Sequence, residues 1–263
     1  MPRGARKKSD TSVYHAMLRG INQQRIFEED EDCTMFLKVL GECKKVSGFE
    51  LFAYCLMGNH VHLLIKVQNE DLNTIFKRIG ARYVYWFNWK YRRSGHLFQD
   101  RFKSEPVIND KQLLTVLRYI HRNPIKANLC GTVGAYRWSS YNEYIGKTGV
   151  ADTGVADTGF VLSMTGKEEF VRYNNDGKDD NFDNSVLEDS VKYYRHSDIE
   201  AKKMMQEICN CDTVSGFQEL DQQKKLYGIA MLRTCGLSIR QISRLTGVSK
   251  SIIERAQRAS EEA

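Results

Sequence analysis

The sequence predicts an α+β fold: a ferredoxin-like antiparallel sheet with helices on one face, followed by a small all-α helix-turn-helix module. Strand-like and helix-like apolar patterns alternate over residues 10–145 in the order strand, helix, strand, strand, helix, strand, helix. Gly58-Asn59 is a strong turn signal between the second and third strands, which should therefore pair as a hairpin. A helix-turn-helix-like pattern within residues 215–260 predicts the C-terminal module.

Local signals support each predicted element. The runs on either side of the Gly58-Asn59 turn are rich in apolar and aromatic residues, as strands are. Asp71 and Asp110 can each cap a helix, because a short carboxylate accepts hydrogen bonds from the first free amides. Pro124 should end the last helix, because proline lacks an amide hydrogen and disfavours helix at the residue before it. The predicted strands are 13–18, 49–57, 60–67 and 106–108, and the predicted helices are 28–46, 71–91 and 110–123.

Composition and charge narrow the class of protein. Of the 263 residues, 41% are hydrophobic, which is enough for a packed core. The chain has no apolar run of about 20 residues, and none follows its basic N-terminus, so neither a membrane helix nor a secretory signal is expected; the expected location is the cytoplasm. The 7 cysteines are irregularly spaced without a CxxC pair, which argues against a disulfide framework or a zinc knuckle. A net charge of +6 permits a polyanionic partner without requiring one.

The segment between the two predicted domains is expected to be a loop insertion and linker with some helix, over residues 146–214. Residues 150–154 repeat directly as 155–159, which is typical of a tolerated loop insertion. In the module that follows, Ser238 would cap the first helix and Gly247 would make the turn. The sequence therefore predicts domains at 10–145 and 215–260.

His60-Val61-His62 is the first candidate for chemistry. Residues i and i+2 of a strand point the same way, so both imidazoles should lie on one face, with Val61 directed into the core. Two imidazoles on one strand are a ready pair of metal ligands. The alternative is a pair of histidines on a solvated face of the sheet.

Tyr119 is the second candidate, together with Asn123. Residues i and i+4 share a helical face, and tyrosine can act as a nucleophile while an asparagine oxygen can bind a metal. The alternative is ordinary helix packing by Tyr119 and a common helix terminator in Asn123, the residue before Pro124.

Four ordered motifs resemble the single-tyrosine HUH transposases, and more closely the REP-associated tyrosine transposases. One contains the His60-Val61-His62 core; the others resemble the family's first strand, the segment after its long helix and its catalytic helix. The resemblance covers about residues 10–145. The motifs are 52–65, 14–22, 95–103 and 119–126, respectively.

The resemblance implies a mechanism. His60 and His62 would bind a divalent metal, and Tyr119 would be the nucleophile. Asn123 would lie near the metal as a third ligand, directly or through water. Because tyrosine has a pKa of about 10, roughly one in a thousand is phenolate at pH 7, and a metal on the phosphate would assist attack. The implied reaction cleaves hairpin-associated single-stranded DNA through a 5′-phosphotyrosine intermediate. Magnesium or manganese is implied, although two histidines alone suggest a softer metal such as zinc.

Basic residues suggest three DNA-binding surfaces. The N-terminal arm would contact DNA or be a solubilising tail, and the segment 82–93 interleaves cations with aromatics that would stack bases or fill the core. The C-terminal module would read duplex DNA through its second helix or contact protein. His15, His96 and His121 are interpreted as structural or surface residues. The candidate DNA contacts are Arg3, Arg6, Lys7, Lys8, Arg19, Arg82, Arg93, Arg101, Arg240, Arg244, Lys250 and Arg255.

Three functions stay open at this level. The leading one is a metal-dependent tyrosine transposase, that is, a single-strand-specific endonuclease and strand transferase. The alternative is a non-catalytic DNA-binding transcriptional regulator. A metal hydrolase without a covalent intermediate is the third. The sequence predicts no membrane partner and leaves open whether the chain is a monomer or a homodimer.

Overall fold

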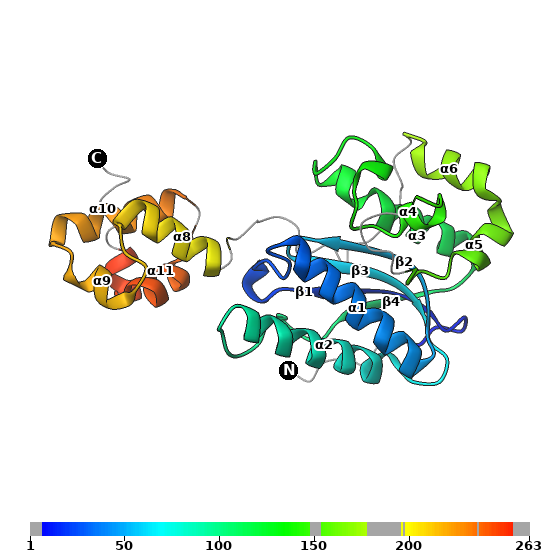
Figure 1. Ribbon diagram of the computed structural model, residues 1–263, viewed down its shortest axis with the longest axis horizontal. Helices are drawn as coiled ribbons and strands as arrows, with labels where there is room; N and C mark the ends of the chain where they lie inside the picture. Colours follow the sequence, from blue (N-terminus) through cyan, green and yellow to red (C-terminus); the bar gives the residue numbers. More distant parts are fainter. Residues whose placement is uncertain (1–6, 148–153, 178–195, 197, 236, 255–263) are drawn as a thin grey trace. The chain divides into compact units, whose positions relative to one another are not determined.

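The sheet has four antiparallel strands in the order β2-β3-β1-β4 (Figure 1). The computed structural model describes residues 7–147, 154–177, 196, 198–235 and 237–254. Each helix that connects β1 to β2 or β3 to β4 crosses over the sheet, which is the ferredoxin-like arrangement, so the predicted fold class is confirmed. The strands are β1 (Val13–Arg19), β2 (Glu50–Met57), β3 (His60–Lys66) and β4 (Lys103–Val107).

Two long helices cover one face of this sheet, as Figure 1 shows for α1 and α2. Side chains alternate along each strand, so every second residue of β1 and β3 is buried in this layer. Asp71 caps α2 as predicted, because its carboxylate accepts a hydrogen bond from the Thr74 amide at 2.9 Å. The helices are α1 (Asp30–Ser47) and α2 (Leu72–Lys90). The strand residues buried against them are Ala16, Leu18, Val61, Leu63 and Ile65.

The opposite face of the sheet carries a second helical layer, in which α3 packs against β2 and β3 (Figure 1). Helix α6 packs on α3 and α5, and α5 also packs on α4; both α5 and α6 lie within the segment expected to be insertion and linker. The buried residues of this layer include Phe52 and Leu64 from the sheet. The elements are α3 (Asp110–Lys126), η2 (Val133–Ala135), α4 (Tyr141–Tyr144), α5 (Thr158–Thr165) and α6 (Lys167–Asn175).

Two local predictions for α3 are wrong. The residue that caps it is Asn109, whose side chain accepts from the Gln112 amide at 2.9 Å, and Asp110 is the first helical residue. Pro124 lies inside α3, which continues to Lys126. A proline this close to a helix end removes a single intrahelical bond, and its carbonyl still accepts from Leu129 at 2.9 Å. Pro124 is buried, so packing outweighs the local preference.

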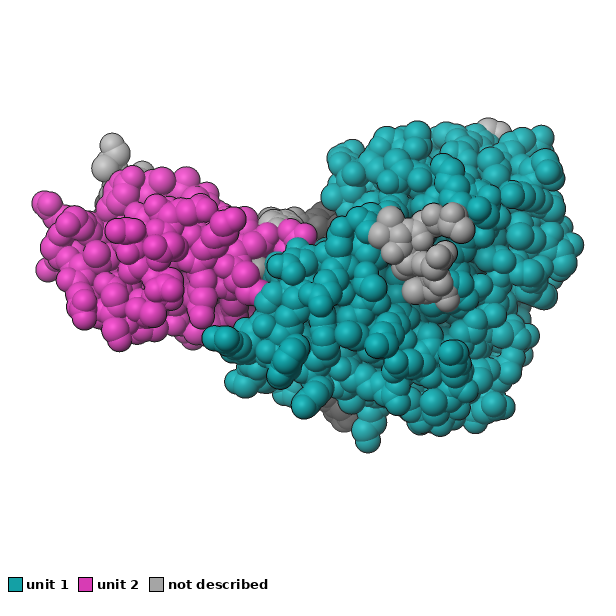
Figure 2. All heavy atoms as spheres, in the orientation of Figure 1, with its two compact units in different colours: residues 1–21, 26–191 teal, residues 22–25, 192–263 magenta. Residues whose placement is uncertain are grey.

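The chain divides into two compact units, residues 1–21 with 26–191 and residues 22–25 with 192–263 (Figure 2). The second unit has its own apolar core, which includes Phe217, Leu232 and Ile242. Ser238 caps α11, with Gln241 completing a capping box, and Gly247 follows with a φ of 70°. A further helical segment occupies residues 250–254, at the end of the described part of the chain. The helices are α8 (Asp198–Cys209), α9 (Val214–Glu219), α10 (Gln222–Thr234) and α11 (Ile239–Thr246).

No helix in the described part of the chain is long and apolar enough to cross a membrane.

Candidate active site

His60 and His62 lie on β3 and face α3, with their ring centroids 4.9 Å apart. Val61 points the other way and is fully buried against α1 and α2. The alternation of a strand therefore puts the two imidazoles on one rigid surface. They are not on a solvated face, because the exposed fraction is 9% for His60 and 2% for His62.

The Nδ1 atom of each of these histidines has a side-chain partner. His60 Nδ1 lies 2.6 Å from Asn59 Oδ1, and His62 Nδ1 lies 3.0 Å from His15 Nε2. His60 Nε2 is buried and makes no hydrogen bond among the described residues. A buried imidazole nitrogen without a partner is costly unless a ligand satisfies it, so this atom suits a metal.

Asn123 reaches the same place from α3, with its Nδ2 atom 3.4 Å from His62 Nε2. Turning the amide over exchanges its nitrogen and oxygen, so the same position can offer an oxygen to a metal. In the described part of the chain, no three His, Cys, Asp or Glu side chains group to hold a metal. A metal held by two histidines would therefore complete its shell with amide, water or phosphate oxygens.

Burial keeps the imidazoles of this site neutral. It lowers the pKa of His60 to about 4, with a smaller effect from the nearby charge of Arg19. It lowers the pKa of His62 well below the ordinary value, helped by His60 and His15, and the pKa of His15 to about 3. Neutral imidazole has a lone pair on one nitrogen, which is the form that binds metals.

Tyr119 is 2% exposed and lies against these histidines. Its ring centroid is 5.7 Å from that of His62 and 5.8 Å from that of His15. The Lys126 ammonium lies 4.8 Å from the Tyr119 ring centroid and belongs to the last turn of α3. Three elements, β1, β3 and α3, thus bring three imidazoles, a phenol and a cation together.

Three residues of this site were not among the sequence candidates. His15 was interpreted as structural or surface, yet it contacts both His62 and Tyr119. The only sequence signal for His15 was the strand alternation it shares with Val13 and Met17 on β1. Asn59 precedes the histidine motif directly and was assigned only to the turn. The sequence signal for Lys126 was its spacing, because it lies seven residues, or two helical turns, after Tyr119.

The candidate DNA contacts lie in several different places. Arg19 pairs with His60 in the β1–β3 register, so it borders the site. Arg82, on the outer layer formed by α1 and α2, pairs with Glu42 at 3.0 Å, and Arg93 lies 5.5 Å from the Phe87 ring centroid. Arg82 is exposed, and so are the other described candidates Lys7, Lys8, Arg101, Arg240, Arg244 and Lys250. Arg3, Arg6 and Arg255 lie outside the described residues.

The aromatic residues of segment 82–93 divide between core and surface. Tyr83 and Phe87 are fully buried, whereas Tyr85 is 77% exposed and Trp89 is 71% exposed. The two exposed rings are four residues apart and share one face of α2.

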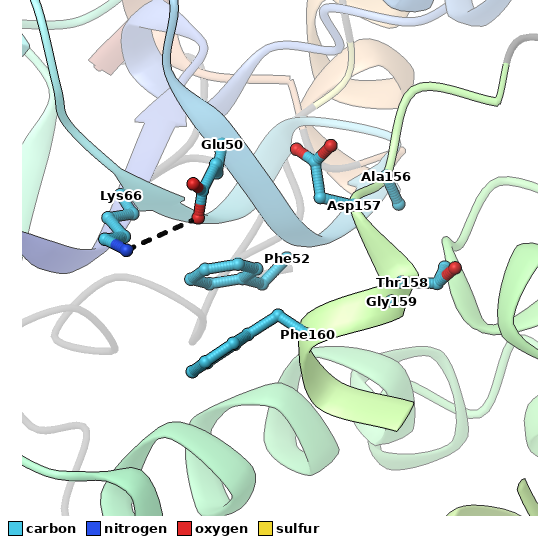
Figure 3. Close-up of a pocket in the computed structure, with 8 residues that line it drawn as sticks. All are labelled: Glu50, Phe52, Lys66, Ala156, Asp157, Thr158, Gly159 and Phe160. Atoms are coloured by element: carbon cyan, nitrogen blue, oxygen red, sulfur yellow. Dashed lines mark ion pairs between the residues drawn. The ribbon is translucent and has the colours of Figure 1, made fainter. Parts of the chain in front are cut away.

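An open hollow of about 520 Å³ lies at the far end of β3, by Lys66. Figure 3 shows the residues that line it. Phe52 stacks on Phe160 there at 5.2 Å, and Lys66 pairs with Glu50 at 3.6 Å. Lys66 and His60 are the last and first residues of the same strand. None of His60, His62 and Tyr119 lines this hollow, so the cavity and the candidate chemistry are separate.

Comparison with known proteins finds a similarity in the segment that holds the site. Residues 8–123 match the family described as "Transposase IS200 like". This segment is therefore similar to IS200-like transposases. It contains His60, His62, Tyr119 and Asn123, whereas α5, α6 and residues 192–263 lie beyond it.

Three individual proteins are similar to parts of this chain. One is a Haemophilus influenzae protein that is named as a REP-associated tyrosine transposase. It is 34% identical over 106 residues, which are 36% of this chain and 60% of that protein. The match thus spans less than two thirds of the relative. A solved REP-associated tyrosine transposase bound to a REP hairpin covers 60% of this chain and 93% of its own, with 14% identity and a TM-score of 0.49. The structure of a transposase from Deinococcus radiodurans covers 46% of this chain and 97% of its own, with 18% identity and a TM-score of 0.33.

Proposed function

We propose that this chain is a metal-dependent tyrosine transposase that cleaves and rejoins hairpin-associated single-stranded DNA. The observation that carries the proposal is the contact of Tyr119 with buried His62, beside His60, whose buried Nε2 makes no hydrogen bond in the described part of the chain. A buried phenol beside imidazoles, within a segment similar to IS200-like transposases, suits attack on a phosphodiester better than it suits packing alone.

His60 and His62 would hold the metal through their Nε2 atoms, with Asn123 as the third ligand, directly or through water. When bound, a divalent ion, magnesium or manganese, would neutralise charge on a non-bridging phosphate oxygen and orient the phosphate. The protein's part is to fix the geometry: β3 supplies the ligands, and α3 supplies the nucleophile.

In the proposed reaction, the Tyr119 hydroxyl attacks the phosphorus atom and the bond from phosphorus to the 3′ oxygen breaks. The phenol loses its proton, and the departing oxygen gains one as a 3′-hydroxyl. The 5′ phosphate stays on Tyr119, so a second 3′-hydroxyl can reverse the step and join a new strand. Lys126 would stabilise negative charge on the phenolate and on the phosphate, because its ammonium lies 4.8 Å from the ring centroid.

The test uses the full chain and a 3′-end-labelled hairpin oligonucleotide from DNA flanking the gene, with manganese. We expect a labelled covalent adduct on a denaturing gel, absent in Tyr119→Phe and after chelation. The Tyr85→Phe variant is the matched control, because this tyrosine is 77% exposed and lies on α2. An adduct that persists in Tyr119→Phe would refute the role of Tyr119, and free product without any adduct would indicate a hydrolase.

The second unit supports an additional role in binding duplex DNA. Its α11, the turn at Gly247 and the helix that begins at residue 250 follow the helix-turn-helix pattern, with Arg240 and Lys250 exposed. Binding to duplex without cleavage, unaffected by His60→Ala, would favour the regulator instead of the transposase.

A further inference from the structure

His15 is fully buried on β1, and the proposed mechanism gives it no role. In the β1–β3 register it lies opposite Leu64, diagonal to His62 on the same face of the sheet. Its Nε2 atom is 3.0 Å from His62 Nδ1, a hydrogen-bond distance. Asn59 Oδ1 makes the equivalent contact with His60 Nδ1 at 2.6 Å.

The protons in these two contacts decide which nitrogens can bind a metal. Asn59 Oδ1 can only accept, so His60 donates from Nδ1 and keeps its lone pair on Nε2. Between His15 and His62 there is one proton, and either ring can donate it. If His62 donates, its Nε2 lone pair is free for a metal; if His15 donates, the proton of His62 is on Nε2 and blocks it.

We propose that His15 is a positioning residue that accepts a hydrogen bond from His62 Nδ1 and so fixes the ring and the tautomer in which His62 binds metal. Asn59 does the same for His60, so both ligands present Nε2. The inference rests on the proposed function, since it concerns the same metal. The geometry supports it, because His15 Nε2 lies within hydrogen-bond distance of His62 Nδ1, at 3.0 Å. Partners of this kind typically change metal affinity by roughly 10–100-fold.

The first test measures Mn²⁺ binding to the full chain by calorimetry, without DNA. We expect His15→Phe, which keeps a ring and removes the acceptor, to weaken binding roughly 10–100-fold. His15→Gln, whose amide oxygen can accept at the same place, should restore most of the affinity. Wild-type affinity in His15→Phe would overturn the proposal, and so would an equal loss in the Phe and Gln variants.

Two controls separate this inference from the proposed function. His96→Phe alters an exposed histidine of the same unit and should leave the affinity unchanged. His60→Ala should abolish the site; if wild type binds Mn²⁺ no better than His60→Ala, the metal site itself fails. Unfolding curves of the metal-free variants show whether each one folds.

The second test needs no variant at His15. Long-range ¹H–¹⁵N spectra of the metal-free chain, labelled in histidine, report the tautomer of each ring. We expect the proton of His62 on Nδ1 and that of His15 on Nδ1. A His62 ring protonated on Nε2 would overturn the inference even if Mn²⁺ binds. The expected tautomers in a chain that does not bind Mn²⁺ would support the role of His15 in fixing the tautomer and would contradict the metal site.

Discussion

Acid should destabilise the first unit through His121, a buried histidine of α3 that the proposed chemistry does not use. Its side chain is fully buried, with Nδ1 3.1 Å from Asn174 Oδ1 and Nε2 2.9 Å from Ser140 Oγ. The rings of Tyr144 and Phe170 lie within 5.6 and 5.9 Å of its ring centroid. Burial lowers the pKa of His121 from 6.5 to about 3, although the hydrogen bond to Asn174 opposes the shift.

The sign and size of the effect follow from this pKa. Between about pH 6.5 and pH 3 the unfolded chain binds a proton at His121 that the folded chain does not. Its contribution to stability is therefore complete above pH 6.5 and declines as the pH falls toward 3. At a pH of about 5 the loss is about 2 kcal/mol relative to neutral pH, from linkage with pKa values of 6.5 and about 3.

The variant that tests this is His121→Gln, which can keep a hydrogen bond to Ser140 or Asn174 but does not titrate. Urea unfolding followed by tryptophan fluorescence reports the first unit alone, because Trp86, Trp89 and Trp138 all belong to it. The drop in unfolding free energy between about pH 7.5 and pH 5 should be about 2 kcal/mol smaller in the variant.

The change in unfolding free energy between the two pH values isolates the contribution of His121. Any constant cost of the substitution cancels, and His15, His60 and His62 titrate alike in both proteins. His96→Gln, at an exposed position, should retain the wild-type pH dependence. If His121→Gln loses as much stability on acidification as wild type, then His121 is not held neutral by burial and the reasoning fails.

Two further predictions concern Lys126 and Gly247. Lys126→Met should slow single-turnover cleavage roughly tenfold, because it removes a charge about 5 Å from the Tyr119 ring. Lys126→Arg should keep most of the rate. Equal rates for Lys126→Met and wild type would contradict the proposed role of Lys126 in stabilising the phenolate. Gly247→Ala should destabilise the second unit by about 1–2 kcal/mol, since φ is 70° and the new Cβ would meet Val214 Cγ1 at 2.8 Å. Hydrogen exchange measured by mass spectrometry should then speed up in residues 198–254 and stay unchanged in the sheet of the first unit, and unaltered protection in 198–254 would count against it.

The sequence allowed the sheet and the histidine pair to be predicted because both depend on local period. The alternation around His60-Val61-His62 and the Gly58-Asn59 turn gave the hairpin, and the Asp71 cap gave the start of α2. The place of His15 depends instead on strand order. It meets His62 because β1 pairs with β3, and that pairing is set by the whole fold.

Predictions about α3 failed where tertiary packing overrides local preference. Pro124 predicts a helix end, yet it is buried within α3, and the helix continues to Lys126. Lys126 is the cation that the proposed chemistry uses. No local pattern in the sequence indicated that a second helical layer would cover the opposite face of the sheet. Whether the boundaries 10–145 and 215–260 mark functional domains stays a prediction.

The proposed active site depends on that second layer. Tyr119 and His121 are two residues apart, about 200° around the helix, so one face of α3 meets the histidines while the other meets α6. His121 is bonded to Asn174 of α6 and to Ser140, whose hydroxyl accepts from the Tyr54 amide of β2 at 3.0 Å. These contacts fix how α3 is rotated over the sheet, and the rotation of α3 aims Tyr119 at His62. The family match ends at residue 123, so the contacts from α6 that orient the proposed nucleophile come from a part of the chain outside it.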